Sequence, residues 1–381
     1  MEKTIHVIIF LCLLIFVLHG CSDDSPTSPE GSVEIGPITA GDPAQNLQEF
    51  EAILERLRNQ LKIPGFSAAI VKNRKIIWAE GFGYANVEDK KKATPTTAYH
   101  LASLTKTFAS TIIMQLVEEG LLDLEAPVSD FGIEIQSSDT VRVKHLLTHT
   151  SEGTPGTFFR YSGDRFGLLD DVIVGASGRS FGELLVERII EPLGLENTVP
   201  NLLNMIHCPL TWPERIEFAE NLAQGYTSDG RERQAYPTYF GTAAGLISSV
   251  IDVAKYSIAI DNHVFLTEET QALVFSPAVS NNGATLPYGL GWFVQQYFGL
   301  KIVWHYGWWT ANSSLIVKVP ERDLTFIILA NTDMLSRAFP TIGYGDISVS
   351  VVALEFLNGF VFGNAELPDA PVSPVFLSHM D

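Results

Sequence analysis

Ser103 and Lys106 form the only Ser-x-x-Lys sequence in the chain, and they stand at the start of an amphipathic stretch. Residues three apart share one face of a helix, so the serine hydroxyl and the lysine amine are expected to point the same way. A serine hydroxyl is a weak nucleophile until a base takes its proton, and a lysine can be that base where burial or a nearby cation lowers its pKa. The pair therefore indicates covalent catalysis by an activated serine. Because this spacing is expected about once by chance in a chain of this length, the surrounding residues must support the interpretation.

The stretch after the serine has the pattern of a helix with one buried face. Apolar residues recur at four-residue spacing, and Gly120 provides a C-terminal stop. The stripe consists of Leu104, Phe108, Ile112 and Leu116. We expect a helix over 103–120, with Ser103 at the positive end of its dipole, where negative charge on the serine oxygen is favoured.

The N-terminal segment has the features of an export signal. An uninterrupted apolar run from Val7 to Leu18 is too short to span a bilayer comfortably and fits the hydrophobic region of a signal peptide. The sequence Leu18-His19-Gly20-Cys21 resembles the bacterial lipobox, in which the cysteine becomes the lipidated first residue of the mature protein. Residues 1–20 are therefore predicted to be a lipoprotein signal peptide and Cys21 a lipid anchor to a membrane, with the protein on the periplasmic or extracellular side. An uncleaved N-terminal anchor is the alternative.

Cysteine content and net charge argue against several kinds of site. Of the three cysteines, Cys12 would leave with the signal peptide and Cys21 would carry lipid, so Cys208 would be alone in the folded body. It would then have no partner for an intramolecular disulfide, and no cysteine cluster could hold a metal. The formal net charge of −19 argues against a nucleic-acid partner, because proteins that bind nucleic acids are basic.

The composition divides the chain into a folded body and two flanking segments. Residues 21–44 are rich in Ser, Asp, Pro and Gly and are predicted to be a flexible linker, and residues 366–381 are predicted to be a tail. The body, residues 45–365, has strand signals first, then helical signals, then strand signals again. This order predicts an α/β (α+β) fold in which both chain ends build one antiparallel sheet flanked by helices, with a mostly helical lobe inserted between them.

The expected elements give the body its internal boundaries. The sheet lobe covers about 45–100 and 240–365 and the helical lobe about 101–239, either as one composite unit or as two lobes that share a core. Strands are expected at Gly65–Val71, Lys75–Gly81, Trp292–Phe298, Ile302–Tyr306, Ser313–Val319 and Leu324–Leu329. Besides the helix at Ser103, helices are expected at Gln45–Leu61, Val143–His149, Phe166–Gly175, Phe181–Pro192 and Ile347–Leu357.

Two further short motifs complete a pattern with the serine. They are Tyr161-Ser162-Gly163 and His305-Tyr306-Gly307. With Ser103 and Lys106 they follow the order of three motifs of serine β-lactamases and penicillin-binding proteins: Ser-x-x-Lys, Tyr-x-Asn, and Lys-Thr-Gly or His-x-Gly. The chain resembles this superfamily from about Phe50 to Leu357, within it the branch related to class C β-lactamases, D-aminopeptidases and family VIII esterases. Further segments that follow the family pattern are Lys144–Ser151, Tyr161–Leu195, Gly241–Ser249 and Tyr288–Trp292.

The resemblance implies a role for each of these residues. Ser103 is the expected nucleophile that forms an acyl-enzyme, and Lys106 and Tyr161 are the expected general base and acid. The sequence does not decide which of the two takes the first proton. The family's oxyanion hole uses two backbone N–H groups, which by position are those of Ser103 and Trp308. The residues carried over to oxyanion and substrate binding are His305, Gly307 and Trp308. The implied activity is hydrolysis of an amide or ester bond in a small-molecule or peptide substrate, without a cofactor.

The sequence departs from the family pattern at three positions. Gly163 replaces the asparagine that normally bonds the lysine and the acyl-amide of β-lactam-like substrates. His305 replaces the lysine of Lys-Thr-Gly and is a weaker anchor for a substrate carboxylate, because histidine is mostly neutral at pH 7. Glu152 replaces a glycine and is unexplained. The departures at Gly163 and His305 favour a peptidase or esterase over an antibiotic-resistance β-lactamase. A catalytically weak penicillin-binding-type module that binds peptidoglycan-like peptides is the alternative.

Other catalytic patterns are absent or incomplete in the sequence. His145 and His149 are four apart, but Leu146 follows the first histidine where a zinc protease has glutamate, and no third ligand is evident, so we expect structural roles and no metal. There is no Gly-x-Ser-x-Gly elbow, which argues against the α/β-hydrolase fold. No phosphate-binding loop or dinucleotide fingerprint is present.

Overall fold

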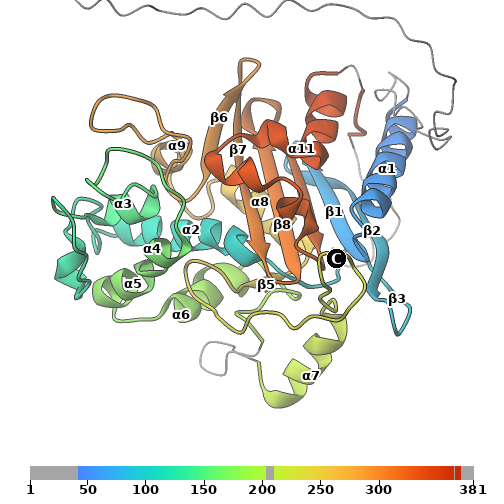
Figure 1. The fold of residues 1–381 in the computed structure, drawn as a ribbon, viewed down its shortest axis with the longest axis horizontal. Helices are drawn as coiled ribbons and strands as arrows, with labels where there is room; N and C mark the ends of the chain where they lie inside the picture. The colour runs from blue at the N-terminus through green and yellow to red at the C-terminus, as the bar shows by residue number, and fades with distance from the viewer. Residues whose placement is uncertain (1–41, 203–209, 364, 370–381) are drawn as a thin grey trace, which may run out of the picture. The chain divides into compact units, whose positions relative to one another are not determined.

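A seven-stranded antiparallel sheet forms the centre of the computed structural model, which describes residues 42–202, 210–363 and 365–369. The strand order is β3-β2-β1-β9-β8-β7-β6 (Figure 1). The strands are β1 (Gly65–Lys72), β2 (Lys75–Asn86), β3 (Lys91–Lys92), β6 (Phe293–Tyr297), β7 (Leu300–Trp309), β8 (Asn312–Val319) and β9 (Leu324–Ala330). The pairing of β1 with β9 joins the two ends of the chain, as the sequence predicts.

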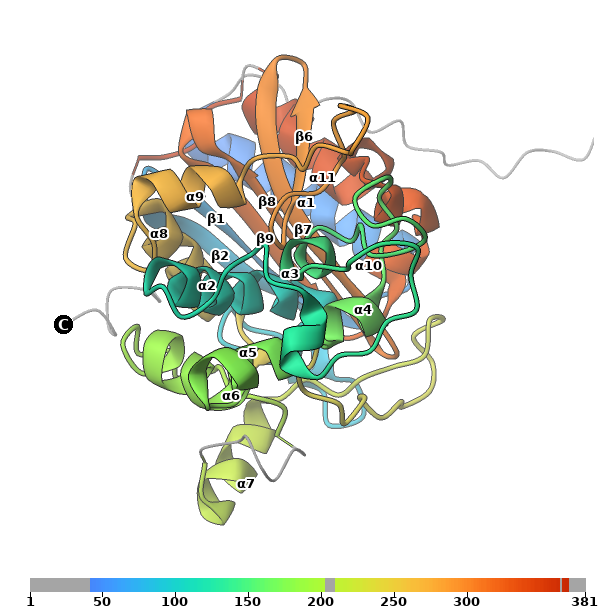
Figure 2. The same cartoon turned by 90° about the vertical axis from the view of Figure 1, so that its left-hand side faces the viewer.

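The central strands are covered on both faces. Every residue of β9, and every residue of β1 except Lys72, is buried, which explains why these strands are continuous apolar runs rather than alternating patterns. Helices α1 (Pro43–Gln60) and α11 (Val351–Phe356) pack on one face, and α2 (Thr105–Glu118) and α8 (Val250–Asp261) lie on the other (Figure 2).

The middle of the chain forms the predicted helical lobe. Its helices include α3 (Val143–Leu147), α4 (Gly163–Gly167), α5 (Leu169–Ser177), α6 (Phe181–Leu185) and α7 (Trp212–Asn221). A two-stranded pair, β4 (Tyr99–His100) and β5 (Ile247–Ser248), lies at the base of α2, and α9 (Glu268–Val274) and α10 (Met334–Arg337) follow later in the chain.

The helix expected over 103–120 begins differently from the prediction. Residues Ala102–Leu104 form a 3₁₀ turn, and α2 continues from it at Thr105. Ala102 has a left-handed φ of 49°, which a right-handed helix does not accommodate, so α2 begins only after this residue. The expected apolar stripe is correct: Leu104, Phe108, Ile112 and Leu116 are each at most 1% exposed.

One hydrophobic core serves both lobes. It joins residues of α2, α5 and α8 with residues of the sheet, among them Phe108, Leu169, Val253, Ile316 and Ile327. Each fully buried side chain of this size stabilises the fold by about 1.5–3 kcal/mol. Helix α2, which carries Lys106 and directly follows the turn of Ser103, therefore has most of its residues buried.

Some sequence predictions fall on residues outside the described ranges. These are the signal peptide, Cys21, nearly all of the linker, Cys208 and residues 370–381. The first residues assigned to the tail are bonded to the body: Lys72 donates to Leu367 O at 2.9 Å, and Asn46 donates to Glu366 O at 2.9 Å. Within the described part of the chain, no helix is long and apolar enough to cross a membrane.

Candidate active site

The Ser103 hydroxyl and the Lys106 amine face each other at the base of α2. Oγ of Ser103 and Nζ of Lys106 are 3.1 Å apart, and Nζ donates a hydrogen bond to Ala243 O at 2.7 Å. Lys106 is 0% exposed. Burial disfavours the ammonium form and lowers the pKa of Lys106 to about 7. The described contacts of Nζ include no carboxylate, so a substantial fraction of this lysine is neutral at pH 7.

The Ala243 carbonyl that bonds Lys106 belongs to a tight turn, and a side chain of α5 bonds this turn. Gly241 and Ala244 bond each other across it, and Thr242 N–H donates to Asp170 Oδ1 at 2.9 Å. A Cβ on Gly241 would come within 2.3 Å of Asp170 Oδ2, so a larger residue here would displace the Asp170 carboxylate. Burial raises the pKa of Asp170 to about 6. Sequence reasoning missed Ala243 and Asp170, because a backbone carbonyl carries no residue-type signal and Asp170 acts only through the fold.

Tyr161 lies beside the pair. The centre of its ring is 5.1 Å from Lys106 Nζ. Its hydroxyl is buried and makes no well-aligned hydrogen bond within the described residues. Burial, with the nearby Tyr306 adding to it, raises the pKa of Tyr161 well above its usual value, while Ser103 acts in the opposite direction. The phenol is therefore protonated at neutral pH.

His149 holds the segment that carries Tyr161. Its Nδ1 accepts a hydrogen bond from Ser162 N–H at 3.2 Å, and its ring lies 4.3 Å from the Tyr161 ring. His145 has a different, local role, because its Nδ1 accepts from Arg142 N–H at 3.0 Å at the start of α3. No group of three or more His, Cys, Asp or Glu residues arranged to hold a metal occurs within the described residues.

His305, which the family resemblance assigns to substrate binding, is buried and hydrogen-bonded through both ring nitrogens. It is 0% exposed, and Nδ1 donates a hydrogen bond to Tyr306 O at 2.7 Å. Nε2 must then be the acceptor for the hydroxyl of Tyr288, which lies 2.8 Å away. Burial and the neighbouring Lys106 hold the pKa of His305 well below its usual value. A neutral ring with both nitrogens occupied does not provide a cation for a substrate carboxylate.

Gly307 brings the end of β7 against the turn that carries Ser103. A Cβ at Gly307 would come within 2.2 Å of Leu101 O and 3.2 Å of Ala102 Cβ, so only glycine permits this contact. The next residue in β7, Trp308, is 37% exposed.

Gly163, which stands where the family has asparagine, is surrounded by open space on its side-chain side. Gly163 is the first residue of α4, and a Cβ added to it would have no heavy atom within 4 Å. The unexplained Glu152 pairs with Arg165, also on α4, at 3.4 Å. That ion pair fixes the loop before Tyr161 to the helix after it.

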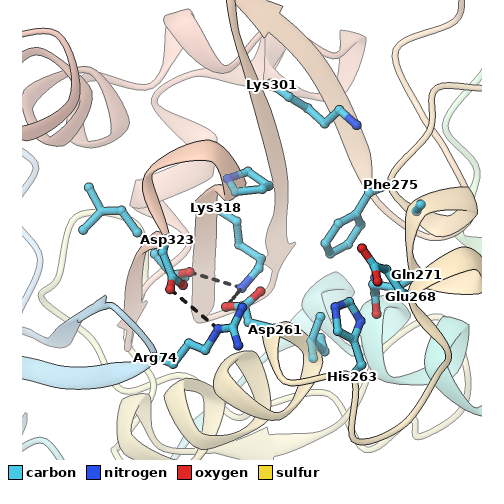
Figure 3. Close-up of a pocket in the computed structure, with 14 residues that line it drawn as sticks. Arg74, Asp261, His263, Glu268, Gln271, Phe275, Lys301, Lys318 and Asp323 are labelled. Atoms are coloured by element: carbon cyan, nitrogen blue, oxygen red, sulfur yellow. Dashed lines mark hydrogen bonds and ion pairs between the residues drawn. The ribbon is translucent and has the colours of Figure 1, made fainter.

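A separate cavity of about 300 Å³ lies at the end of α8, against α9 and the β8–β9 turn (Figure 3). The buried Lys318 points into this region and pairs with Asp261 at 2.8 Å, while Arg74 pairs with Asp323 at 3.6 Å. None of the residues predicted to be catalytic lines it.

A Ser-x-x-Lys pair at the base of a buried helix, beside an antiparallel sheet built from both chain ends, defines the class of serine β-lactamases and penicillin-binding proteins. The comparison with known families agrees. The beta-lactamase family matches residues 50–342, more than half of the chain, and the chain belongs to this family. Members of the family are typically serine hydrolases. The superfamily predicted from the sequence is thus confirmed, and the branch related to D-aminopeptidases and family VIII esterases stays a prediction.

Individual relatives are distant. The chain is 27% identical over 309 residues to penicillin-binding protein 4* of Bacillus subtilis (strain 168), covering 68% of this chain and 66% of that protein. It is 25% identical over 328 residues to Protein flp of Staphylococcus aureus (strain MW2), covering 74% of this chain and 63% of that protein. The chain thus spans about two thirds of the length of these curated relatives. Among solved structures, the octameric penicillin-binding protein homologue from Pyrococcus abyssi matches with a TM-score of 0.69 and 27% identity, over 82% of this chain and 77% of that one.

Proposed function

We propose that the protein hydrolyses esters or amides through an acyl-enzyme on Ser103. The observation that carries the proposal is the 3.1 Å contact between Ser103 Oγ and the buried Lys106 Nζ, whose pKa burial lowers to about 7. A neutral amine at this distance is a competent base for the hydroxyl.

The two pKa directions favour one order of proton transfer. Lys106 is partly neutral at pH 7 and Tyr161 is protonated, so Lys106 takes the Ser103 proton as Oγ attacks the substrate carbonyl. Tyr161 then protonates the leaving alcohol or amine and regains a proton from the Lys106 ammonium. In the second half of the reaction, water replaces the leaving group. Tyr161 and Lys106 take a proton from this water as its oxygen attacks the acyl carbon, and the proton returns to Oγ as Ser103 is released as the alcohol.

The negative charge on the carbonyl oxygen needs donors that are already in place. By position in the family these are the N–H groups of Ser103 and Trp308, and the close contact at Gly307 supports their proximity. Fixed donors of this kind contribute about 3–4 kcal/mol each to the transition state.

The charge around the site favours a neutral substrate. His305, at the position of the family's lysine, is neutral and bonded on both nitrogens. Arg165, on α4, is already paired with Glu152. We therefore place uncharged esters and amides ahead of carboxylate-bearing β-lactams, which corresponds to a peptidase or esterase. On the sequence of residues 1–21 alone, we further propose an exported, lipid-anchored protein of the cell envelope.

Intact-mass spectrometry tests the proposal directly. The protein is incubated with penicillins, D-amino-acid amides and short-chain p-nitrophenyl esters, and the acyl adduct and its lifetime are recorded. We expect a short-lived adduct with esters or amides in the wild type and none in Ser103→Ala, with turnover at least about 10³-fold lower. Ser110→Ala, on the helix that follows the nucleophile, is the matched control. A persistent adduct without turnover would favour the penicillin-binding module, and no adduct with any substrate would overturn the proposal.

A further inference from the structure

The turn before the nucleophile contains a strained residue. Ala102 has a φ of 49°, in the left-handed region that an L-residue other than glycine seldom adopts. Such a conformation costs about 1–3 kcal/mol and persists only where surrounding contacts impose it. The dihedral angles of Ala102 set the direction of the next peptide plane, which carries the Ser103 N–H.

Both peptide planes that flank Ala102 are held by side chains. In the plane before it, Ala102 N–H donates to His100 Nδ1 at 3.1 Å, and Leu101 O accepts from Ser314 Oγ at 2.7 Å. In the plane after it, Ala102 O accepts from Thr105 Oγ1 at 2.7 Å. Because this carbonyl and the Ser103 N–H belong to one peptide unit, fixing the carbonyl also fixes the direction of the N–H.

His100 is positioned to hold the turn at Ala102, and the proposed mechanism assigns it no other role. It is 0% exposed at the end of β4, and its ring lies 5.8 Å from that of Tyr236 and 6.1 Å from that of Trp309. Burial lowers the pKa of His100 to about 4, with Asn312 acting in the opposite direction. The ring is therefore neutral at pH 7, and because Nδ1 accepts from a backbone N–H, the proton is on Nε2.

We propose that His100 is a positioning residue for the nucleophile: by accepting the Ala102 N–H, it holds the turn in its left-handed conformation and aims the backbone N–H and hydroxyl of Ser103. This inference rests on the proposed acyl-enzyme function. The bond from residue i+2 to the side chain of residue i is the one that asparagine makes in an Asx turn. An asparagine at position 100 is therefore able to replace the acceptor, whereas a phenylalanine is able to replace only the ring.

This difference separates positioning from packing. We expect His100→Phe to lower kcat for p-nitrophenyl butyrate by about 10- to 100-fold, the size of loss that a small misplacement of reacting groups causes, with KM changed less than about 3-fold. We expect His100→Asn to keep kcat within about 5-fold of wild type. We expect His100→Phe to be thermally more stable than His100→Asn, because phenylalanine fills the buried space and asparagine leaves part of it empty. A purely structural role would instead make activity follow stability.

Each result has a defined meaning. Wild-type kcat in His100→Phe, or an equal loss of kcat in both variants, would overturn the role of His100. If His100→Phe does not fold, Ser314→Ala removes the other bond to the same peptide plane: a lower kcat at unchanged KM supports the inference and an unchanged kcat contradicts it. If wild type forms an adduct without turnover, the rate of adduct formation replaces kcat. A wild type that forms no adduct at all contradicts the proposed function itself.

Discussion

The Lys106 amine donates a hydrogen bond to the Ala243 carbonyl oxygen at 2.7 Å, across 137 positions of sequence. The amine is buried among apolar rings, with the Phe166 ring centre 5.3 Å away. A carbonyl oxygen orients the amine but carries no full negative charge, so it does not stabilise the ammonium form as a carboxylate would. The lone pair of the neutral amine is therefore available to the Ser103 hydroxyl, and the predictions below follow from this arrangement.

Lys106→Arg should be almost as damaging as Lys106→Ala. A guanidinium keeps its proton in a protein and cannot accept one from Ser103, whatever its position. We expect both variants to lose at least about 10³-fold in kcat/KM for a p-nitrophenyl ester. Turnover within about 10-fold of wild type in Lys106→Arg would exclude lysine from proton transfer.

Activity should rise with pH through neutrality. The base form of Lys106 is the neutral amine, and burial lowers its pKa to about 7, so kcat/KM should fall about tenfold per unit below that pH. We expect no step from His305 near neutral pH, because burial and the neighbouring Lys106 hold its pKa well below its usual value. A rate profile recorded from pH 5 to 9, corrected for spontaneous hydrolysis, checks this. A flat profile across pH 6–8 would contradict the assignment of the base.

Lys106→Met should inactivate the enzyme and stabilise the fold near pH 7. In the unfolded chain the pKa of Lys106 has its ordinary value of 10.5, and in the folded protein burial lowers it to about 7, so folding to the neutral amine is costly below pH 10.5. Between these two values the unfolded state binds more protons, so wild-type stability rises with pH by about 1.4 kcal/mol per unit from this group. In Lys106→Met, which has no titratable group at this position, stability does not gain this contribution as the pH rises.

Denaturant unfolding of both proteins at pH 7, 8 and 9 measures the difference. The stability advantage of Lys106→Met should shrink as pH rises. An advantage that is constant or grows with pH would show that the Lys106 pKa is not depressed by folding.

Gly163→Asn should fold and should change the reactivity of the site. A side chain at this position meets no heavy atom within 4 Å of its Cβ, so we expect the midpoint of thermal unfolding to change by less than about 3 °C. The amide restores the residue that the family uses to bond the lysine and the acyl-amide of β-lactam-like substrates. We expect faster acylation by a penicillin relative to ester hydrolysis.

Gly163→Ala is the matched control, since it adds the Cβ without the amide. Acylation rates from intact-mass spectrometry give the ratio for each variant. Equal ratios in wild type, Gly163→Ala and Gly163→Asn would mean that the missing asparagine does not set the substrate preference.

Sequence patterns were enough to predict the sheet, the helical insertion and the serine–lysine pair. Apolar runs such as Leu324–Leu329, and the stripe on the helix after Ser103, are local patterns whose period depends only on backbone geometry. The spacing of Ser103 and Lys106 needs one turn of helix to become a contact, and the contact is present. Local patterns were therefore sufficient to predict contacts between residues that lie about one helical turn apart in the chain.

The surroundings of Ser103 and Lys106 follow from tertiary packing. The Ala243 carbonyl, the Asp170 contact that fixes its turn, and the burial that lowers the Lys106 pKa all come from segments distant in sequence. The sequence correctly placed His305 on a strand, β7, but no local pattern connects it to Tyr288, whose hydroxyl bonds its ring. Protonation and orientation respond to the complete environment of a group, and that environment exists only once the chain has packed.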